Sequence, residues 1–170
     1  MYELKANEKA TPVVVYTENT LIHGEIVTRD IVRVNILMRT EGAPNYLHLL
    51  NAQIIYPDNA TKIVKFAELF VPATEAIGYH VAPGTEIELD YDESEENRKM
   101  QPVKAAMGSF FIDSKIRIST HTDLSTTLDV SRTAWLSLYE AEITNTYLSQ
   151  MKVEAKMILI RPEKILFGLV

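Results

Sequence analysis

The sequence predicts a mainly β protein built from two tandem repeats, with an α+β fold as the alternative. The main observation is an internal repeat, because the segment YLHLLNAQI at residues 46–54 is matched by WLSLYEAEI at residues 135–143. The match continues on both sides at an offset of 89 or 90 residues, and it pairs Ile22, Ile26, Leu69, Pro72 and Gly78 with Ile112, Ile116, Leu159, Pro162 and Gly168. The second observation is that most segments of both copies alternate apolar and polar residues or are β-branched, which is typical of strands. Each repeat is therefore expected to hold four to five strands and one short helix.

The first repeat covers residues 12–81. Strands are predicted at residues 13–16, 21–28, 46–56, 62–71 and 76–81. Gly24, inside the second of these strands, predicts a bulge or a close approach of two backbones. Asp30 is a candidate N-cap for a short helix, which Gly42 and Pro44 bring to an end.

The second repeat covers residues 103–170 and repeats this order. Strands are predicted at residues 109–119, 134–146, 153–160 and 164–170, and Thr122 or Asp123 is expected to cap a short helix. The run KMILI at residues 156–160 is almost continuously apolar, which predicts a strand buried on both faces in the middle of the structure. The last strand, residues 164–170, is expected to be an integral and buried part of the second sheet.

Residues 82–102 form an acidic linker between the repeats. Residues 84–102 alone carry a net charge of −5, so the rest of the chain accounts for only −1 of the total of −6. Residues 85–91 alternate polar and apolar side chains and could extend a strand, whereas residues 92–99 are expected to be solvated. The acidity is therefore assigned to the linker, and the repeats are expected to pack together about a pseudo-twofold axis, because each alone has a marginal core.

The composition narrows the class of protein. The chain has no cysteine, which excludes disulfides, thiolate metal sites and cysteine nucleophiles. No apolar run approaches the ~20 residues of a membrane helix, and the N-terminal residues lack the apolar core of a signal peptide. A cytoplasmic protein that does not enter a membrane is expected. The absence of a basic stripe makes nucleic acid an unlikely partner.

No motif predicts a catalytic, cofactor-binding or metal-binding residue. The four histidines occur at positions that the other repeat does not share, and none has the spacing of a zinc site. No serine lies in a Gly-x-Ser-x-Gly motif, and the six glycines are too scattered for a phosphate loop. An enzyme is therefore the least supported class, and no cofactor is expected.

Four residues are candidates for an interaction surface: Tyr46, His48, Trp135 and Tyr139. Tyr46 and Trp135 occupy equivalent positions at the start of the apolar alternation, and exposed aromatic side chains on a sheet could bind a protein or stack on bases. The competing interpretation is that the large residue at this position attaches the helix to the sheet inside the core, and it is favoured because no basic residues interleave with the aromatic ones.

The repeat resembles an uncharacterised bacterial domain with no assigned activity, on the segments LSTTL at 124–128 and WLSLYEA at 135–141. A remoter resemblance is to Sm-like small β-barrels, because LHLLNA at 47–52 is similar to the Leu-x-Leu-x-Asp-Ala strand of that fold and the late IRP at 160–162 is similar to Ile-Arg-Gly. Asn51 and Glu140 replace the aspartate and Pro162 replaces the glycine, and the nucleotide pocket of that family depends on these residues.

Three functions follow as hypotheses. The leading one is a non-catalytic interaction or scaffold module with a protein partner, with an unspecified oligomeric state. The second is an Sm-like module that binds a small ligand or nucleic acid, and the third is an enzyme of unknown class.

Overall fold

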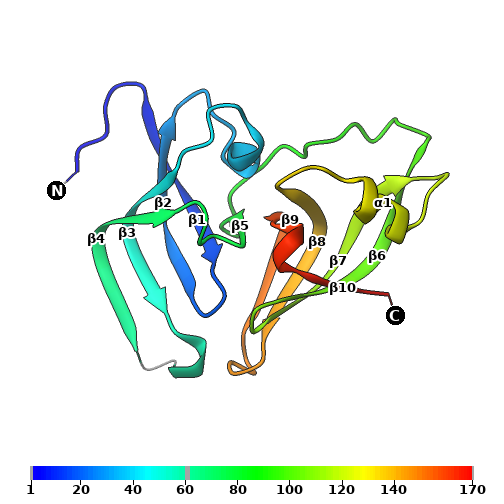
Figure 1. The fold of residues 1–170 in the computed structure, drawn as a ribbon. Helices are drawn as coiled ribbons and strands as arrows, with labels where there is room; N and C mark the ends of the chain where they lie inside the picture. Colours follow the sequence, from blue (N-terminus) through cyan, green and yellow to red (C-terminus); the bar gives the residue numbers. More distant parts are fainter. Residues whose placement is uncertain (1, 60–61, 170) are drawn as a thin grey trace.

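A computed structural model describes residues 2–59 and 62–169, in which ten antiparallel strands form one open sheet (Figure 1). The first half of the chain contains β1 (Glu8–Tyr16), β2 (Leu21–Arg29), the 3₁₀ helix η1 (Val34–Arg39), β3 (Tyr46–Ile55), the 3₁₀ helix η2 (Pro57–Asn59), β4 (Ile63–Pro72) and β5 (Gly78–Val81). The second half contains β6 (Arg98–Met107), β7 (Phe110–Ser119), the helix α1 (Leu124–Val130), β8 (Leu136–Asn145), β9 (Lys152–Ile160), the 3₁₀ helix η3 (Pro162–Lys164) and β10 (Leu166–Gly168). The expected mainly β class is confirmed.

The strand order of the sheet is β10-β6-β7-β8-β9-β5-β1-β2-β3-β4. The first half supplies β5-β1-β2-β3-β4, and the second half supplies β10-β6-β7-β8-β9 in the same relative order. The halves join where β5 pairs with β9, through Gly78 opposite Ile160 and Tyr79 opposite Leu159. Both halves read in the same direction along the sheet, whereas a twofold axis would reverse one of them, and the expected pseudo-twofold arrangement is therefore not confirmed.

Each half contains a β-bulge at the same place. The register between β2 and β3 shifts between His23 and Glu25, as the glycine between them predicts, and the register between β7 and β8 shifts between Asp113 and Lys115. A Cβ added at Gly24 would lie 3.3 Å from the Cβ of Leu49, so the close approach is also confirmed. Because the bulge adds one residue to a strand, the alternating side chains that face the core shift by one position beyond it.

The core crosses the joint between the halves. Trp135 and Leu159 of the second half are buried in the core of the first half, while Tyr16 and Ile77 of the first half are buried in the core of the second. The ring of Tyr16 meets the ring of Phe110 edge-on at 4.9 Å. Because each core is completed by residues of the other half, the two halves pack as one body. The run at 156–160 lies in the middle of the sheet, as its apolarity predicts.

The helix of the first half differs from its prediction. It is the short 3₁₀ helix η1, which begins after Arg33 and has no side-chain cap. Asp30 accepts a hydrogen bond from the backbone N–H of Ile31 instead, so it shapes the turn that precedes the helix. In the second half, Asp123 accepts from the N–H of Thr126 and caps α1, as expected.

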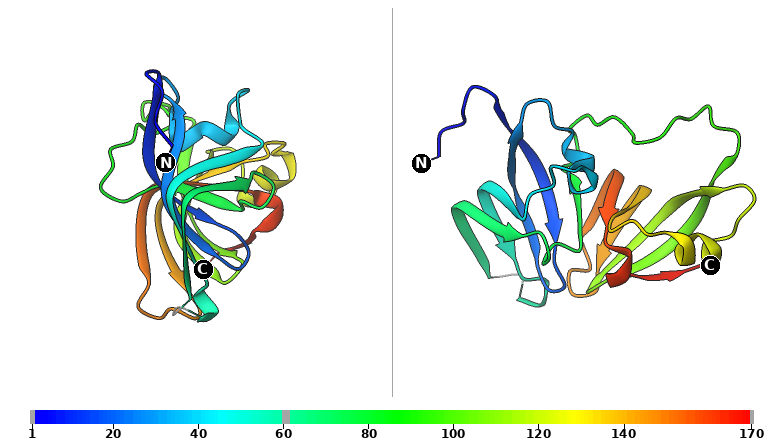
Figure 2. Two further views of the ribbon diagram at one scale, coloured as in Figure 1. Left: turned by 90° about the vertical axis from the view of Figure 1, so that its left-hand side faces the viewer. Right: turned by 45° about the horizontal axis from the view of Figure 1, so that its top comes forward.

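The ends of the linker and of the chain also differ from their predictions. Residues 98–102 belong to β6, because the backbone pairing with β7 begins at Arg98 opposite Ser119, and residues 85–91 form no strand. The segment before β6 runs from one half to the other beside the joint (Figure 2). The C-terminal strand has only three residues, but it pairs with β6 and is therefore part of the sheet, as expected. Ile165 is buried, whereas Leu166 and Leu169 are 76% and 60% exposed, so the expected burial of this segment is only partly confirmed. Val170 lies outside the described residues.

No helix in the described ranges has the length and apolarity needed to cross a membrane.

Candidate functional site

The four candidate interaction residues lie on two separate surfaces. Trp135 and Tyr139 lie at the inner joint, which we define as the contact of β8 and β9 with the first half. Tyr46 and His48 lie on the outer surface. We define this surface as Tyr46 and His48 of β3 together with Phe70 of the edge strand β4. The structure therefore divides the predicted site into two places with different environments.

Trp135 is buried at the inner joint, with only 3% of its surface exposed. The ring of Tyr79, from β5 of the first half, meets the indole edge-on at 5.7 Å. The guanidinium of Arg161 lies over the same indole at 4.9 Å. The competing interpretation of Trp135, a residue of the core, is the one that these contacts support.

Arg161 attaches the second half to the backbone of the first. Its Nε donates to the carbonyl of Ala76 at 3.0 Å and one terminal nitrogen donates to the carbonyl of Ala73 at 2.8 Å. Its backbone N–H donates to the carbonyl of Ile77 at 2.9 Å, which extends the short pairing of β5 with β9. Two main-chain carbonyl groups and one ring thus hold the side chain, and a third carbonyl group holds the backbone.

Asp90 is the other anchor of the joint. Its side chain is only 7% exposed and accepts hydrogen bonds from Arg39 at 2.5 Å, from Ser137 at 2.6 Å and from the hydroxyl of Tyr139 at 2.7 Å. Arg39 belongs to η1 of the first half, while Ser137 and Tyr139 belong to β8. The carboxylate therefore ties the segment between the halves to both of them.

The electrostatics of this cluster favour a charged Asp90. Burial by itself opposes ionisation, but the hydrogen bonds of Ser137 and Tyr139 and the charge of Arg39 outweigh it, so the pKa of Asp90 lies below its usual value. Burial, together with the hydrogen bond to Asp90, raises the pKa of Tyr139. Tyr139 is therefore a hydroxyl donor that stays protonated, which is a structural role.

A cavity of about 400 Å³ opens beside this cluster, lined in part by Tyr91, Arg117 and Tyr139. Arg117 donates to Glu95 at 2.6 Å and to the carbonyl of Asp92 at 2.8 Å, and it lies 4.5 Å from the centre of the Tyr91 ring. Arg39 and Asp90 form one ion pair at its wall, Arg117 and Glu95 form another, and Arg98 also lines it. The contacts of Arg117 hold the segment between the halves against β7.

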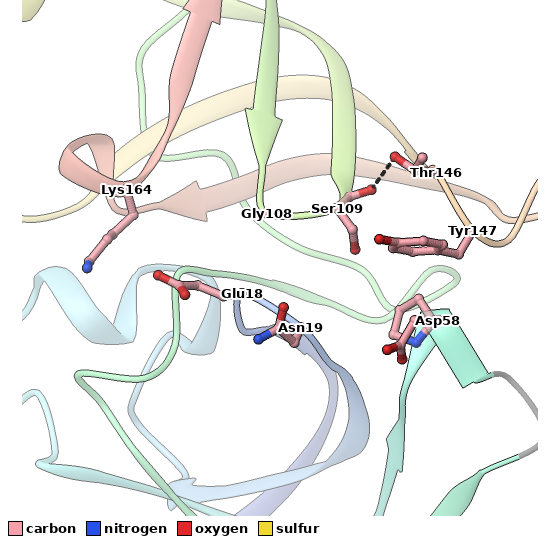
Figure 3. Close-up of a pocket in the computed structure, with 9 residues that line it drawn as sticks. Glu18, Asn19, Asp58, Gly108, Ser109, Thr146, Tyr147 and Lys164 are labelled. Atoms are coloured by element: carbon pink, nitrogen blue, oxygen red, sulfur yellow. Dashed lines mark hydrogen bonds between the residues drawn. The ribbon is translucent and has the colours of Figure 1, made fainter.

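A second cavity, of about 520 Å³, lies between turns of the two halves (Figure 3). Glu18 and Asn19 face it from the first half, and Ser109, Tyr147 and Lys164 face it from the second. Thr146 donates to the carbonyl of Ser109 at 3.2 Å, beside the cavity. Its lining combines two acidic residues, Glu18 and Asp58, and one basic residue, Lys164, with neutral ones.

The outer surface is different, because large apolar side chains there are left in contact with solvent. Tyr46 is 57% exposed and Phe70 is 56% exposed. The ring of His48 stacks on Phe70 with 4.6 Å between centroids, and its Nε2 lies 3.0 Å from a carboxylate oxygen of Glu68. The ring of Tyr2 meets that of His48 edge-on, with 4.7 Å between centroids. The ring of His48 is thus contacted by Phe70, Glu68 and Tyr2.

Sequence reasoning selected Tyr46 and His48 and missed Phe70, Asp90 and Arg161. Phe70 carries a signal, since it is directly opposite His48 in the strand that follows. Asp90 and Arg161 carry no such signal, because their partners are far away in the chain. Tyr139 lies 49 positions from Asp90, and Ala73 lies 88 positions from Arg161.

Across residues 2–59 and 62–169, no three histidine, aspartate or glutamate side chains are grouped so that they could hold a metal ion. Comparisons with protein-family models, with curated proteins and with solved structures found no match for the chain.

Proposed function

We propose that the protein is a non-catalytic interaction or scaffold module that binds a protein partner through the outer surface of Tyr46, His48 and Phe70. The observation that carries this proposal is the exposure of two large aromatic side chains, at 57% and 56%, on the edge strand of the sheet and its neighbour. Aromatic side chains are enriched at protein interfaces, where they bury a large area with little loss of rotamer freedom.

The free edge of the sheet supports the same proposal. β4 pairs with β3 on one side only, so its other side presents backbone N–H and carbonyl groups that another strand could use. The polar residue nearest to the stacked rings is Glu68, a carboxylate. A carboxylate beside the rings opposes a phosphate backbone, and a protein is therefore favoured over nucleic acid.

The duplication is part of the proposal. We infer that the two halves are copies of one unit joined head to tail, which is supported by their equal strand orders and by the bulge that both share. In this arrangement the chain contains the same interaction surface twice, and the inner joint uses one of the two copies.

The test is the capture of partners from the cytoplasm of the native organism by the immobilised protein. Phe70→Ser should lose at least one protein that the unchanged chain retains. The matched control is Phe111→Ser, because Phe111 is a phenylalanine of the second half with a similar exposure of 53%. Equal sets of captured proteins for all three chains would overturn the proposal, and retention on heparin or RNA would favour the nucleic-acid alternative.

A further inference from the structure

The inner joint shows how one half of this chain binds another. The second half contributes Trp135 and Leu159, which are 3% and 0% exposed, and the first half covers them with Tyr79 of β5. Tyr79 lies directly opposite Leu159 in the antiparallel pairing. The contact is heterologous, because the surface given by one half differs from the surface given by the other.

The outer surface is the counterpart of the covered surface in the second half. Leu49 pairs with Leu69, and Leu138, which lies 89 positions later, pairs with Ile158. The backbone pairing therefore makes Phe70 the counterpart of Leu159. The sequence alignment alone pairs Leu159 with Leu69, one position away. Trp135 is in the same way the counterpart of Tyr46.

The same two positions thus have opposite environments in the two halves. Trp135 and Leu159 are buried because a neighbouring half covers them, whereas Tyr46 and Phe70 are 57% and 56% exposed where the sheet ends. All four side chains are large and apolar. The first half therefore keeps the side chains of a joint without the element that would cover them.

The other end of the sheet supplies the covering element. Val15 pairs with both Ile22 and Tyr79, and Ala105 pairs with both Ile112 and Phe167. Because Ile22 and Ile112 are equivalent in the repeat, the counterpart of Tyr79 is Phe167 of β10. β10 is the last strand of the sheet, and Leu166 beside Phe167 is 76% exposed.

We propose that copies of this chain bind one another head to tail, with β10 of one copy pairing antiparallel with β4 of the next and Phe167 lying opposite Phe70. This inference rests on the proposed function, and it names the partner as a second copy of the chain. The occupant follows from the inner joint, in which the counterpart strands β5 and β9 already make this contact within one chain.

The contact between copies is weaker than the inner joint. Pro72 occupies the position of Arg161, so the contact between copies lacks a backbone N–H donor. It also lacks the guanidinium, which in the inner joint donates to two carbonyl groups of the first half. Association is therefore reversible and depends on protein concentration, as is usual for small contacts.

Disulfide trapping tests the register, and the chain suits it because it contains no cysteine. Phe70→Cys and Phe167→Cys are made as two separate single-cysteine chains, mixed and oxidised. A head-to-tail contact yields a covalent dimer in the mixture and little in either chain alone, because each chain then lacks the opposite cysteine. The control is Ile31→Cys, at an 83% exposed position away from both edges, mixed with Phe167→Cys.

Sedimentation of the unchanged chain gives a second measurement that needs no substitution at the contact. Its mean mass should rise as the concentration is raised from micromolar to millimolar, and Tyr46→Glu together with Phe70→Glu should abolish that rise. A mixed dimer no more abundant than in the control, a dimer of Phe70→Cys with itself, or a constant monomer mass would each overturn the inference. A monomeric chain whose capture of another protein still requires Phe70 would leave the proposed function standing, so the two failures are distinct.

Discussion

Asn51 and Glu140 lie 89 positions apart and both have a left-handed backbone, with φ angles of 50° and 48°. Each lies in the bulge of its half, and each side chain contacts the neighbouring strand of the bulge. Asn51 donates to Glu25, and Lys115 forms an ion pair with Glu140. Glu25 and Lys115 are themselves equivalent, so the same contact is made twice with different chemistry.

The strained backbone at Glu140 gives the first prediction. Glu140→Val should destabilise the protein by about 1–2 kcal/mol, because β-branched side chains are disfavoured in the left-handed region, whereas Glu140→Gly should leave stability near its original value. Urea unfolding measures both. Glu142→Val is the matched control, since Glu142 lies in the same strand outside the bulge and its ion pair with Lys152 is exposed. Equal losses for Glu140→Val and Glu142→Val would contradict the prediction.

Gly108 gives a prediction about the contact between the turns of the two halves. Its φ is +57°, and an added Cβ would lie 2.4 Å from the carbonyl oxygen of Glu18 in the first half. Gly84 has a φ of +88° with no atom within 4 Å of such a Cβ. Gly108→Ala should therefore lower the thermal midpoint clearly more than Gly84→Ala, because only the former adds a backbone clash to the conformational strain of about 1 kcal/mol. Indistinguishable midpoints would show that the two turns move apart freely.

His80 gives a prediction about acid stability. Burial foremost lowers its pKa to about 4, and the ring is fixed by Tyr16 at 2.9 Å and by the carbonyl of Val81 at 2.8 Å. Because the Val81 carbonyl can only accept, Nδ1 carries the proton and Nε2 accepts from the Tyr16 hydroxyl. In the unfolded chain this histidine binds a proton when the pH falls below its ordinary pKa of 6.5. In the folded chain it binds a proton only when the pH falls to about 4. Stability is therefore complete above pH 6.5 and falls by about 1.4 kcal/mol per pH unit toward pH 4.

The matched pair for this prediction is His80→Gln and His121→Gln. The free energy of unfolding should depend less steeply on pH between 6.5 and 4 in His80→Gln, while His121→Gln, at an exposed turn, should keep the slope of the unchanged protein. Denaturant unfolding at a series of pH values measures these slopes. An unchanged slope in His80→Gln would show that another group takes up the proton.

Asp90 gives the fourth prediction. Its pKa is lowered in the folded state, so its contribution is present above the ordinary value of 3.8 and is lost as the pH falls through the lower folded value. Asp90→Asn should cost roughly 1–3 kcal/mol at neutral pH, because charged hydrogen bonds to three partners are weakened. The difference from the unchanged protein should shrink below pH 3.8. Asp113→Asn, whose partner Lys104 is more than half exposed, should cost little at any pH.

Much of the fold follows from local patterns that the sequence displays. The alternation in β3 and β8 and the apolar run of β9 predict their strands. Gly24 marks its bulge, where an added Cβ would lie 3.3 Å from the Cβ of Leu49, closer than an ordinary contact. The shape of the assembly does not follow in this way. The joint between β5 and β9 depends on two residue pairs and on Arg161, and the partners of these groups are far away in the chain.

The candidate residues show the same division. Tyr46 and Trp135 have equal local contexts, and sequence reasoning treats them alike. Their exposures of 57% and 3% differ because a neighbouring half covers one and not the other. Sequence reasoning places Asp90 in the acidic linker, in a segment that could extend a strand, and gives it no partner. Its three hydrogen-bond donors come from η1 and β8, far away in the chain. The burial of these residues depends on elements that are distant in the sequence, so the residues next to them in the sequence do not indicate it.

The way in which Arg161 holds the first half has a consequence for how this protein can change over evolutionary time. Its side chain binds the carbonyl oxygens of Ala73 and Ala76, and every amino acid supplies such an oxygen. Mutations at the exposed residues Thr74 and Glu75 of this loop can therefore accumulate while the contact persists, whereas loss of the arginine removes the contact at once. Divergent descendants of this chain should accordingly keep an arginine directly after the β9 strand and an aromatic residue directly before the β8 strand. Both should be kept even where the exposed part of the loop before β5 has changed in sequence.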